Sequence, residues 1–264
     1  MKKYTGFSKT GIVFGALGVA LLGIFAFFII SNILNATNYE NYDFFSIIEP
    51  TKDNGWIGDH VKGSKDAPVV IYEYADYQCS VCAAYGPYIN QAITELDGKL
   101  AIVYRNFLLS YHSNSTAAAS AAEAAGLQGY WQAYADRLFA TQEEWFYATG
   151  NERTNLFTKY FNEVTDGKGD VEKFNRDRAS SEVAKKLEFD AGIAKRSELP
   201  GTPSFLIDGQ IINYGNKGGG SVTVNGKTVT WDSAKTGSKI VDLLKEIVDA
   251  KLSTTEDSSS TKAE

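Results

Sequence analysis

Hydrophobic positions divide the chain into an apolar N-terminal run and a longer region in which strand-like and helix-like patterns alternate. Residues 11–30 are almost unbroken in their apolar character. A helix of that length spans about 30 Å, the thickness of the hydrocarbon core of a bilayer. The apolar region of a cleaved signal peptide is about 7–15 residues long, so we expect an uncleaved signal-anchor. Lys2, Lys3 and Lys9 precede the run, and by the positive-inside rule they place the N-terminus in the cytoplasm.

These boundaries predict a cytoplasmic N-terminus at 1–9, a transmembrane signal-anchor at 10–31 and a juxtamembrane linker at 32–55. Residues 56–252 suffice for one well-buried domain, which we expect outside the cytoplasm on a single-pass anchor in the cell membrane. The tail at 253–264 is rich in Ser, Thr and charged residues and is predicted to be disordered.

Within the domain, the pattern first predicts a strand, a helix and a second strand. Val69–Tyr74 is apolar on both faces, which is typical of a central strand that is covered on both sides. Glu73 interrupts this pattern. From Cys82 to Leu96, apolar residues recur at three- and four-residue steps, which predicts a helix. Leu100–Phe107 predicts the second strand.

A long helical tract separates these elements from the last part of the domain. Its helices are expected at 113–128, at 130–145, around 156–164 and, as one or two helices, at 170–195. The chain then returns to strands at 203–207 and 210–214, a hairpin at 222–230 and an amphipathic helix at 240–252. The expected order is therefore strand, helix, strand, helical block, strand, strand, helix.

The two cysteines of the chain, Cys79 and Cys82, lie at the head of the first predicted helix. A spacing of two residues on the first helical turn brings their sulfurs within bonding distance. The free N–H groups and the dipole at the helix N-terminus stabilise a thiolate on the first cysteine. A thiolate is the species that attacks disulfides. We therefore predict Cys79, at the exposed end of the helix, as the attacking sulfur and Cys82, one turn further in, as the buried resolving thiol.

Two other interpretations of the cysteines are weaker. A zinc site needs more ligands, and the spacing of His60 and His112 fits no zinc-finger pattern. A structural disulfide that closes a loop over two residues stabilises a fold only slightly. We predict no metal and no cofactor, and we expect His112 at the surface. The net charge of −6 gives no support for nucleic-acid binding.

Five motifs in order along residues 56–252 point to one family. They are residues 63–68 leading into the first strand, Asp76-Tyr77-Gln78-Cys79, Pro87, Gly201-Thr202-Pro203, and residues 110–114 before the Ala-rich helix. Together they resemble the membrane-anchored DsbA-like thioredoxin-fold disulfide oxidoreductases. The resemblance implies an α/β thioredoxin-like fold with an all-helical insertion at about 113–196, preceded by one N-terminal transmembrane helix.

The resemblance also implies roles for three further residues. Pro203 would be a cis-proline that faces the cysteines and leaves the backbone of Thr202 free to bind an extended substrate; the alternative is an ordinary trans-proline at a strand start. Glu73, desolvated in an apolar strand, would have a raised pKa and relay a proton to Cys82. The alternative is that the Glu73 carboxylate is exposed to solvent.

One departure from the family pattern concerns the dipeptide between the cysteines. The family usually has Pro first and often His or an aromatic residue second, whereas this chain has Ser80-Val81. Because Val81 cannot donate a hydrogen bond to the thiolate, we expect a milder oxidant than the Pro-His members.

The predicted function is an extracytoplasmic thiol–disulfide oxidoreductase, acting as an oxidase that introduces disulfides into exported cysteine-containing proteins. An oxidase of this family requires a quinone-linked membrane partner for reoxidation. Two alternatives stay open: a disulfide reductase or isomerase, and a peptide-binding chaperone module with an idle disulfide.

Overall fold

The computed structural model describes residues 39–212, 220–231 and 239–253, together with residues 22, 25, 26 and 37. The chain divides into two compact units, 1–41 and 42–264. In the first, the 3-10 turn η1 spans Tyr39–Asn41. Almost all of the predicted signal-anchor and of the predicted tail lies outside the described residues. Within the described ranges, no helix has the length and apolar character needed to cross a membrane.

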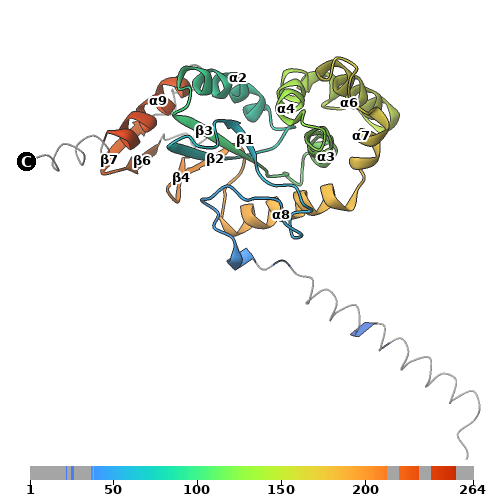
Figure 1. Cartoon of the computed structure of the whole chain (residues 1–264), viewed down its shortest axis with the longest axis horizontal. Helices are drawn as coiled ribbons and strands as arrows, with labels where there is room; N and C mark the ends of the chain where they lie inside the picture. The colour runs from blue at the N-terminus through green and yellow to red at the C-terminus, as the bar shows by residue number, and fades with distance from the viewer. Residues whose placement is uncertain are drawn as a thin grey trace, which may run out of the picture. The chain divides into compact units, whose positions relative to one another are not determined.

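A five-stranded mixed sheet forms the centre of the second unit (Figure 1). Its strands, in the spatial order β1-β3-β2-β4-β5, are β1 His60–Gly63, β3 Leu100–Asn106, β2 Val69–Ala75, β4 Ser204–Ile207 and β5 Gln210–Ile212. β2 and β3 are parallel, and helix α2 (Ser80–Glu95) connects them. β4 runs antiparallel to β2. The central, doubly covered position predicted for the first strand is therefore confirmed, whereas β1 was not predicted because its four residues, HVKG, carry no strand pattern.

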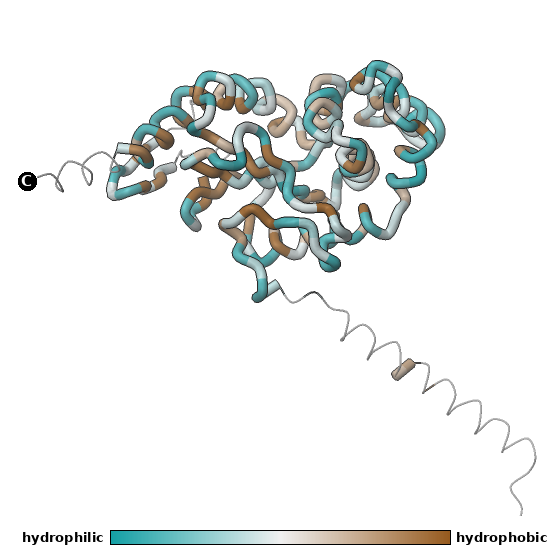
Figure 2. Tube along the Cα trace, in the orientation of Figure 1, coloured by the Kyte–Doolittle hydropathy of each residue, from teal (hydrophilic) through white to brown (hydrophobic). Residues whose placement is uncertain are grey.

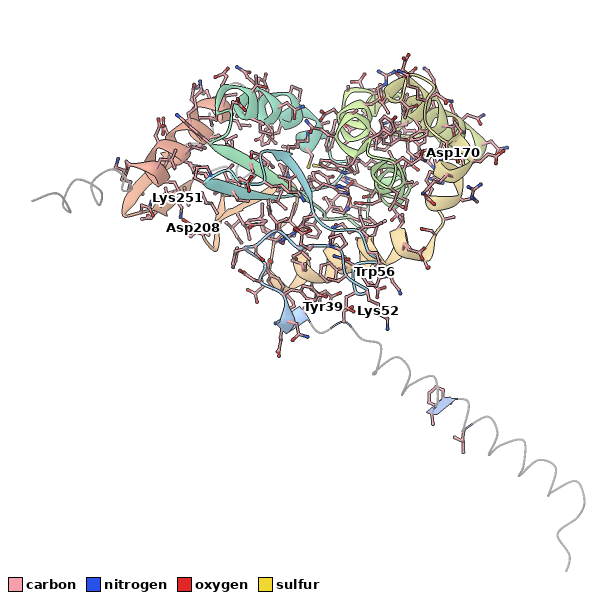
Figure 3. All side chains as sticks on the ribbon, viewed as in Figure 1. Tyr39, Lys52, Trp56, Asp170, Asp208 and Lys251 are labelled. Atoms are coloured by element: carbon pink, nitrogen blue, oxygen red, sulfur yellow. The ribbon has the colours of Figure 1, made fainter. Side chains whose placement is uncertain are left out.

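One face of the sheet is covered by α2 and by the last helix, α9 (Lys239–Leu252), as Figure 1 shows. Figure 2 shows hydrophobic residues concentrated along the strands beneath these helices. β6 (Gly220–Val224) and β7 (Lys227–Trp231) form the predicted hairpin beside α9. Its two turn residues, Asn225 and Gly226, both have positive φ, as a tight hairpin turn requires. Asp208, in the turn between β4 and β5, pairs with Lys251 near the end of α9 (Figure 3).

The predicted helical insertion is present as α3 Ser115–Gly126, α4 Trp131–Ala140, α5 Gln142–Trp145, α6 Gly150–Val164, α7 Val171–Asp177 and α8 Ser181–Arg196. Small alanines of α3 and large aromatic side chains of α4, α6 and α7 share one core. Phe161 and Phe174, for example, stack with ring centroids 4.2 Å apart. The single helix predicted at 130–145 is two helices. It breaks at Thr141, whose hydroxyl donates a hydrogen bond back to the carbonyl of Arg137.

The predicted linker at 32–55 is wrong over its second half, because residues 42–55 pack on the domain. Ile48 is buried, and its N–H donates to Asp59 at 2.9 Å. The fully buried guanidinium of Arg105, on β3, donates to the carbonyls of Phe44 and Ser46 at 2.8 and 2.9 Å. Composition could not reveal this segment as part of the domain, since the group that fixes its backbone lies on a distant strand.

Candidate active site

The turn between β2 and α2 is fixed by one buried carboxylate. Asp76 has no exposed surface. Its Oδ1 accepts the N–H of Gln78 at 2.8 Å, and its Oδ2 accepts the N–H of Leu109 at 2.9 Å. His112 Nδ1 lies 2.9 Å from the same Oδ2. The expectation of a surface His112 is therefore wrong: the ring is mostly buried and braces the turn that carries Cys79.

Cys79 is the residue that caps α2, and Cys82 lies one turn into the helix. Both are free thiols. Cys82 is 1% exposed, and Cys79 is 6% exposed rather than open to solvent as predicted. Gln142 of α5 encloses Cys79 on one side, donating to its carbonyl at 3.1 Å and to the carbonyl of Tyr77 at 2.7 Å. Gln142 was not predicted from the sequence, because nothing in its spacing links it to the cysteines.

The loop before β4 encloses Cys79 on the other side. The Thr202–Pro203 peptide bond is cis, as predicted. Cys79 Sγ lies 3.5 Å from the carbonyl oxygen of Thr202, to which the protonated thiol donates. Among the described residues, the buried hydroxyl of Thr202 has no hydrogen-bond partner. The structure thus brings Thr202 and Pro203 to the cysteines, and their role in binding substrate stays a prediction.

The two thiols have pKa values shifted in opposite directions. A hydrogen bond from Cys82 lowers the pKa of Cys79 to about 6, against the opposing effect of burial. The N–H groups of Cys82 and Val81 contribute to the same lowering. Burial raises the pKa of Cys82 well above its usual value. In the described structure the Ser80 hydroxyl makes no hydrogen bond to Cys79. At neutral pH, therefore, Cys79 is a thiolate and Cys82 a thiol, which supports Cys79 as the attacking sulfur.

Glu73 is buried on β2 and is 3% exposed. Burial raises the pKa of its carboxyl to about 7, although the positive charge of Lys62 opposes the rise. The alternative of a solvent-exposed carboxylate is therefore wrong. The charge of Glu73 contributes to the raised pKa of Cys82, so the two groups lie within electrostatic range of each other. The proton relay itself stays a prediction.

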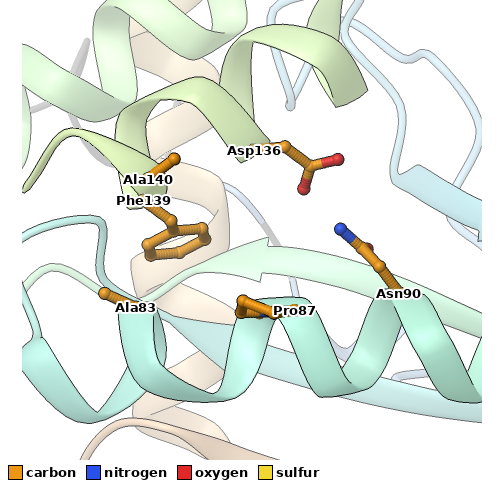
Figure 4. Close-up of a pocket in the computed structure, with 7 residues that line it drawn as sticks. Ala83, Pro87, Asn90, Asp136, Phe139 and Ala140 are labelled. Carbon is orange, nitrogen blue, oxygen red and sulfur yellow. The ribbon is translucent and has the colours of Figure 1, made fainter.

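A pocket of about 240 Å³ runs between α2 and α4, as Figure 4 shows. Its apolar wall is formed by Ala83, Gly86, Pro87, Phe139 and Ala140, and its polar edge by Asn90 and Asp136. Lys62 Nζ donates to both edge residues, at 3.0 Å to Asn90 and 2.6 Å to Asp136. The polar edge of the pocket therefore lies against Lys62, the cation whose charge lowers the pKa of Glu73. These residues come from three separate elements, and no motif in the sequence joins them.

Comparison with known proteins identifies the family. A thioredoxin family model matches residues 56–218, more than half of the chain. The chain belongs to the thioredoxin family. This membership and the buried dithiol together support the prediction of a protein thiol–disulfide oxidoreductase.

Two solved structures share this thioredoxin fold. Alpha-DsbA1 from Wolbachia pipientis has a TM-score of 0.54 and 19% sequence identity, over 75% of this chain and 94% of that one. Oxidised BdbD from Bacillus subtilis has a TM-score of 0.52 and 17% identity, over 78% of this chain and 100% of that one. At this identity the likeness shows the fold, and it agrees with the predicted DsbA-like architecture.

A curated relative, the Na(+)/H(+) antiporter NhaA 1 of Mycobacterium sp. strain KMS, is 32% identical over 155 residues. The match covers 58% of this chain and 24% of the antiporter. A similar protein of Salinispora arenicola is 32% identical over 157 residues, which cover 22% of its length. The thioredoxin-family chain thus spans about a quarter of the length of these relatives.

Proposed function

We propose that this thioredoxin-family chain is an extracytoplasmic oxidase that introduces disulfides into exported proteins through Cys79 and Cys82. The observation that carries the proposal is the place of Cys79 at the N-terminus of α2, where Cys82 and the backbone N–H groups lower the pKa of its thiol to about 6. A stabilised thiolate favours the reduced pair over the disulfide, so the oxidised pair readily accepts electrons from a substrate.

The reaction starts from the disulfide between the two cysteines. A substrate thiolate attacks Cys79 Sγ, a mixed disulfide forms, and the bond to Cys82 breaks. Cys82 leaves as a thiolate and takes up a proton. A second substrate thiolate then attacks the substrate sulfur of the mixed disulfide, which forms the substrate disulfide and releases Cys79 as a thiolate. Two electrons pass from substrate to enzyme, and the low pKa of Cys79 makes it a good leaving group.

Two buried groups fit the remaining steps of this proposal. Glu73, with a pKa of about 7, is partly protonated at neutral pH and is suited to supply the proton that Cys82 needs. The backbone of Thr202, whose carbonyl oxygen lies 3.5 Å from Cys79 Sγ, is suited to pair with an extended substrate segment beside the sulfur.

The location rests on the sequence of the N-terminus. Three lysines and an uncharged apolar run support a signal-anchor with the thioredoxin domain outside the cytoplasm, where disulfides persist. Each turnover leaves the pair reduced, so the oxidase requires an electron acceptor, for which we propose a quinone-linked membrane protein.

The test follows a single turnover, starting once from the oxidised protein and once from the reduced protein. The oxidised protein is mixed with an equal amount of a reduced dithiol peptide, and the products are separated after acid quenching. An oxidase transfers its disulfide almost completely and equilibrates with glutathione at a potential well above the roughly −270 mV of thioredoxin. Transfer that runs instead from reduced protein to peptide disulfide would establish the reductase alternative, and no exchange in either direction would leave the chaperone alternative.

A further inference from the structure

A second pocket lies in the helical block, among α3, α6 and α7, which pack side by side (Figure 1). Its volume is about 160 Å³. Since one water molecule takes about 30 Å³ in the liquid, the pocket has room for a ligand of several non-hydrogen atoms. Its lining includes Arg153, Arg178, Ser120, Thr154 and Asn175. The dithiol chemistry uses none of these residues directly.

The two arginines of this pocket carry positive charge that no acid compensates. Among the described residues, neither Arg153 nor Arg178 forms an ion pair with an Asp or a Glu. Burial lowers the pKa of Arg178, and the adjacent charge of Arg153 lowers it further. Arg153 also lies near the N-terminus of α6, where the helix dipole adds to the positive potential. Two like charges held together without a counterion favour the binding of an anion.

The hydrogen-bonding groups of the pocket are mainly donors. Arg178 packs over the ring of Phe174, and its buried Nη1 has no hydrogen-bond partner in the described structure. The carbonyl oxygen of Asn175 accepts from Thr158 at 3.3 Å, so its amide NH₂ remains to donate. A buried charged donor without an acceptor is unfavourable. Arg178 Nε and Nη2 also have no hydrogen-bond partner among the described residues, so a ligand with several acceptor oxygens would supply acceptors for this guanidinium.

We propose that this pocket binds a compact oxyanion through the guanidinium groups of Arg178 and Arg153. A planar guanidinium presents parallel N–H groups that match two oxygens of a phosphate or a carboxylate. The amide of Asn175 supplies a further donor. This oxyanion site is separate from the redox activity, because a different cluster of side chains forms it.

The pocket is connected to the active-site turn. Arg153 Nη1 donates to Asn114 Oδ1 at 2.6 Å, and the N–H of Asn114 donates to Gln78 Oε1 at 2.6 Å. Gln78 directly precedes Cys79. Substituting Arg153 would therefore disturb the dithiol turn together with the pocket. Arg178 is the better residue to test, since it makes no such connection.

The experiment measures phosphate binding to the full chain, purified in detergent with its cysteines reduced. Inorganic phosphate is titrated by calorimetry at constant ionic strength, and thermal unfolding is followed in phosphate and in chloride. We expect saturable binding and a higher melting temperature in phosphate. Arg178→Gln should weaken phosphate binding by about tenfold or more, because it removes a charge-assisted hydrogen bond. Arg176→Gln is the matched control, since Arg176 is exposed on the same helix, pairs with Glu172 and should leave binding unchanged.

Acetate and sulfate identify the chemistry of the ligand: binding of both ions indicates a general oxyanion site, and binding of acetate alone indicates a carboxylate site. Circular dichroism checks that the variants fold. If Arg178→Gln does not fold, Arg178→Lys keeps the charge, loses the planar fork and should weaken binding several-fold.

Absence of saturable binding would overturn the proposal. An equal rise in melting temperature in wild type and Arg178→Gln would do the same, because phosphate stabilises proteins in general by exclusion from their surface.

Discussion

Two buried carboxylates, Glu73 and Asp59, show how the same chemical group serves opposite purposes in this fold. Burial alone would raise the pKa of Asp59, but the charges of Lys186 and Arg105 outweigh it and hold the pKa below its usual value. Arg105 Nη2 lies 2.7 Å from Asp59, and both side chains are fully buried. Glu73 has no such partner at contact distance in the described structure, and burial raises its pKa to about 7. The paired carboxylate fixes the N-terminal segment of the domain, whereas the unpaired one is able to gain and lose a proton.

Like Glu73, the two cysteines gain or lose a proton during the proposed reaction, and they also form and break the disulfide. Substituting them should therefore have the largest effect. Cys79→Ala should abolish disulfide transfer and trap no substrate. Cys82→Ala should accumulate mixed disulfides, which form when the Cys79 thiolate attacks a substrate disulfide and persist because Cys82 is no longer present to displace the substrate. Non-reducing gels of cells that express each variant make the measurement. The reverse pattern would exchange the roles of the two cysteines.

Removing the ion-pair partner of Asp59 should cause the largest loss of stability. Arg105→Met leaves Asp59 and the carbonyls of Phe44 and Ser46 without their main donor. We expect a loss of about 3–5 kcal/mol in the free energy of unfolding, measured by urea denaturation. Arg137→Met is the control, because the Arg137–Glu163 pair is partly exposed and should contribute about 1 kcal/mol or less. Equal losses in the two variants would remove the distinction between the buried network and a surface pair.

The unpaired carboxylate should instead make stability depend on pH. The folded-state pKa of Glu73 is raised from 4.5 to about 7, so the folded state binds the proton more tightly than the unfolded state. Stability should fall as pH rises from about 4.5 to about 7 and then level off, by about 3 kcal/mol in total. Glu73→Gln should remove this slope and be the more stable protein at pH 8. Identical pH profiles of the two proteins would show that Glu73 titrates normally.

The smallest expected effect concerns Val81, which is exposed beside the thiolate and cannot donate to it. Val81→His adds a donor and a positive charge. A gain of about 1.4 kcal/mol for the thiolate corresponds to about 30 mV, so the substitution should raise the reduction potential by tens of millivolts and lower the pKa of Cys79 in parallel. Equilibration with glutathione buffers measures the potential. If neither quantity changes, the dipeptide does not determine how oxidising this protein is.

Local sequence patterns predicted the parts of the site that depend on local structure. The spacing of Cys79 and Cys82 and the double-faced strand that buries Glu73 each express a rule that acts within a few residues, whereas the cis conformation before Pro203 was expected only from the resemblance to the family. The same patterns could not place Gln142, Lys62 or Asp136, which reach the site from other elements. The same patterns wrongly predicted residues 42–55 as a linker and His112 as a surface residue. The partner of the segment is Arg105 and the partner of His112 is Asp76, and only the structure shows these contacts.

The most direct test of the account is the pKa of Cys79 in the reduced protein. The rate of alkylation by iodoacetamide, followed from pH 4 to 9, reports the fraction of Cys79 present as thiolate, and Cys82→Ala identifies the signal of Cys79. Because a hydrogen bond from Cys82 lowers this pKa, the wild type should show a midpoint near pH 6, and the variant a midpoint shifted upward. A wild-type midpoint near the value of about 8.5 for a free cysteine would contradict the stabilised thiolate, and with it the proposed oxidase.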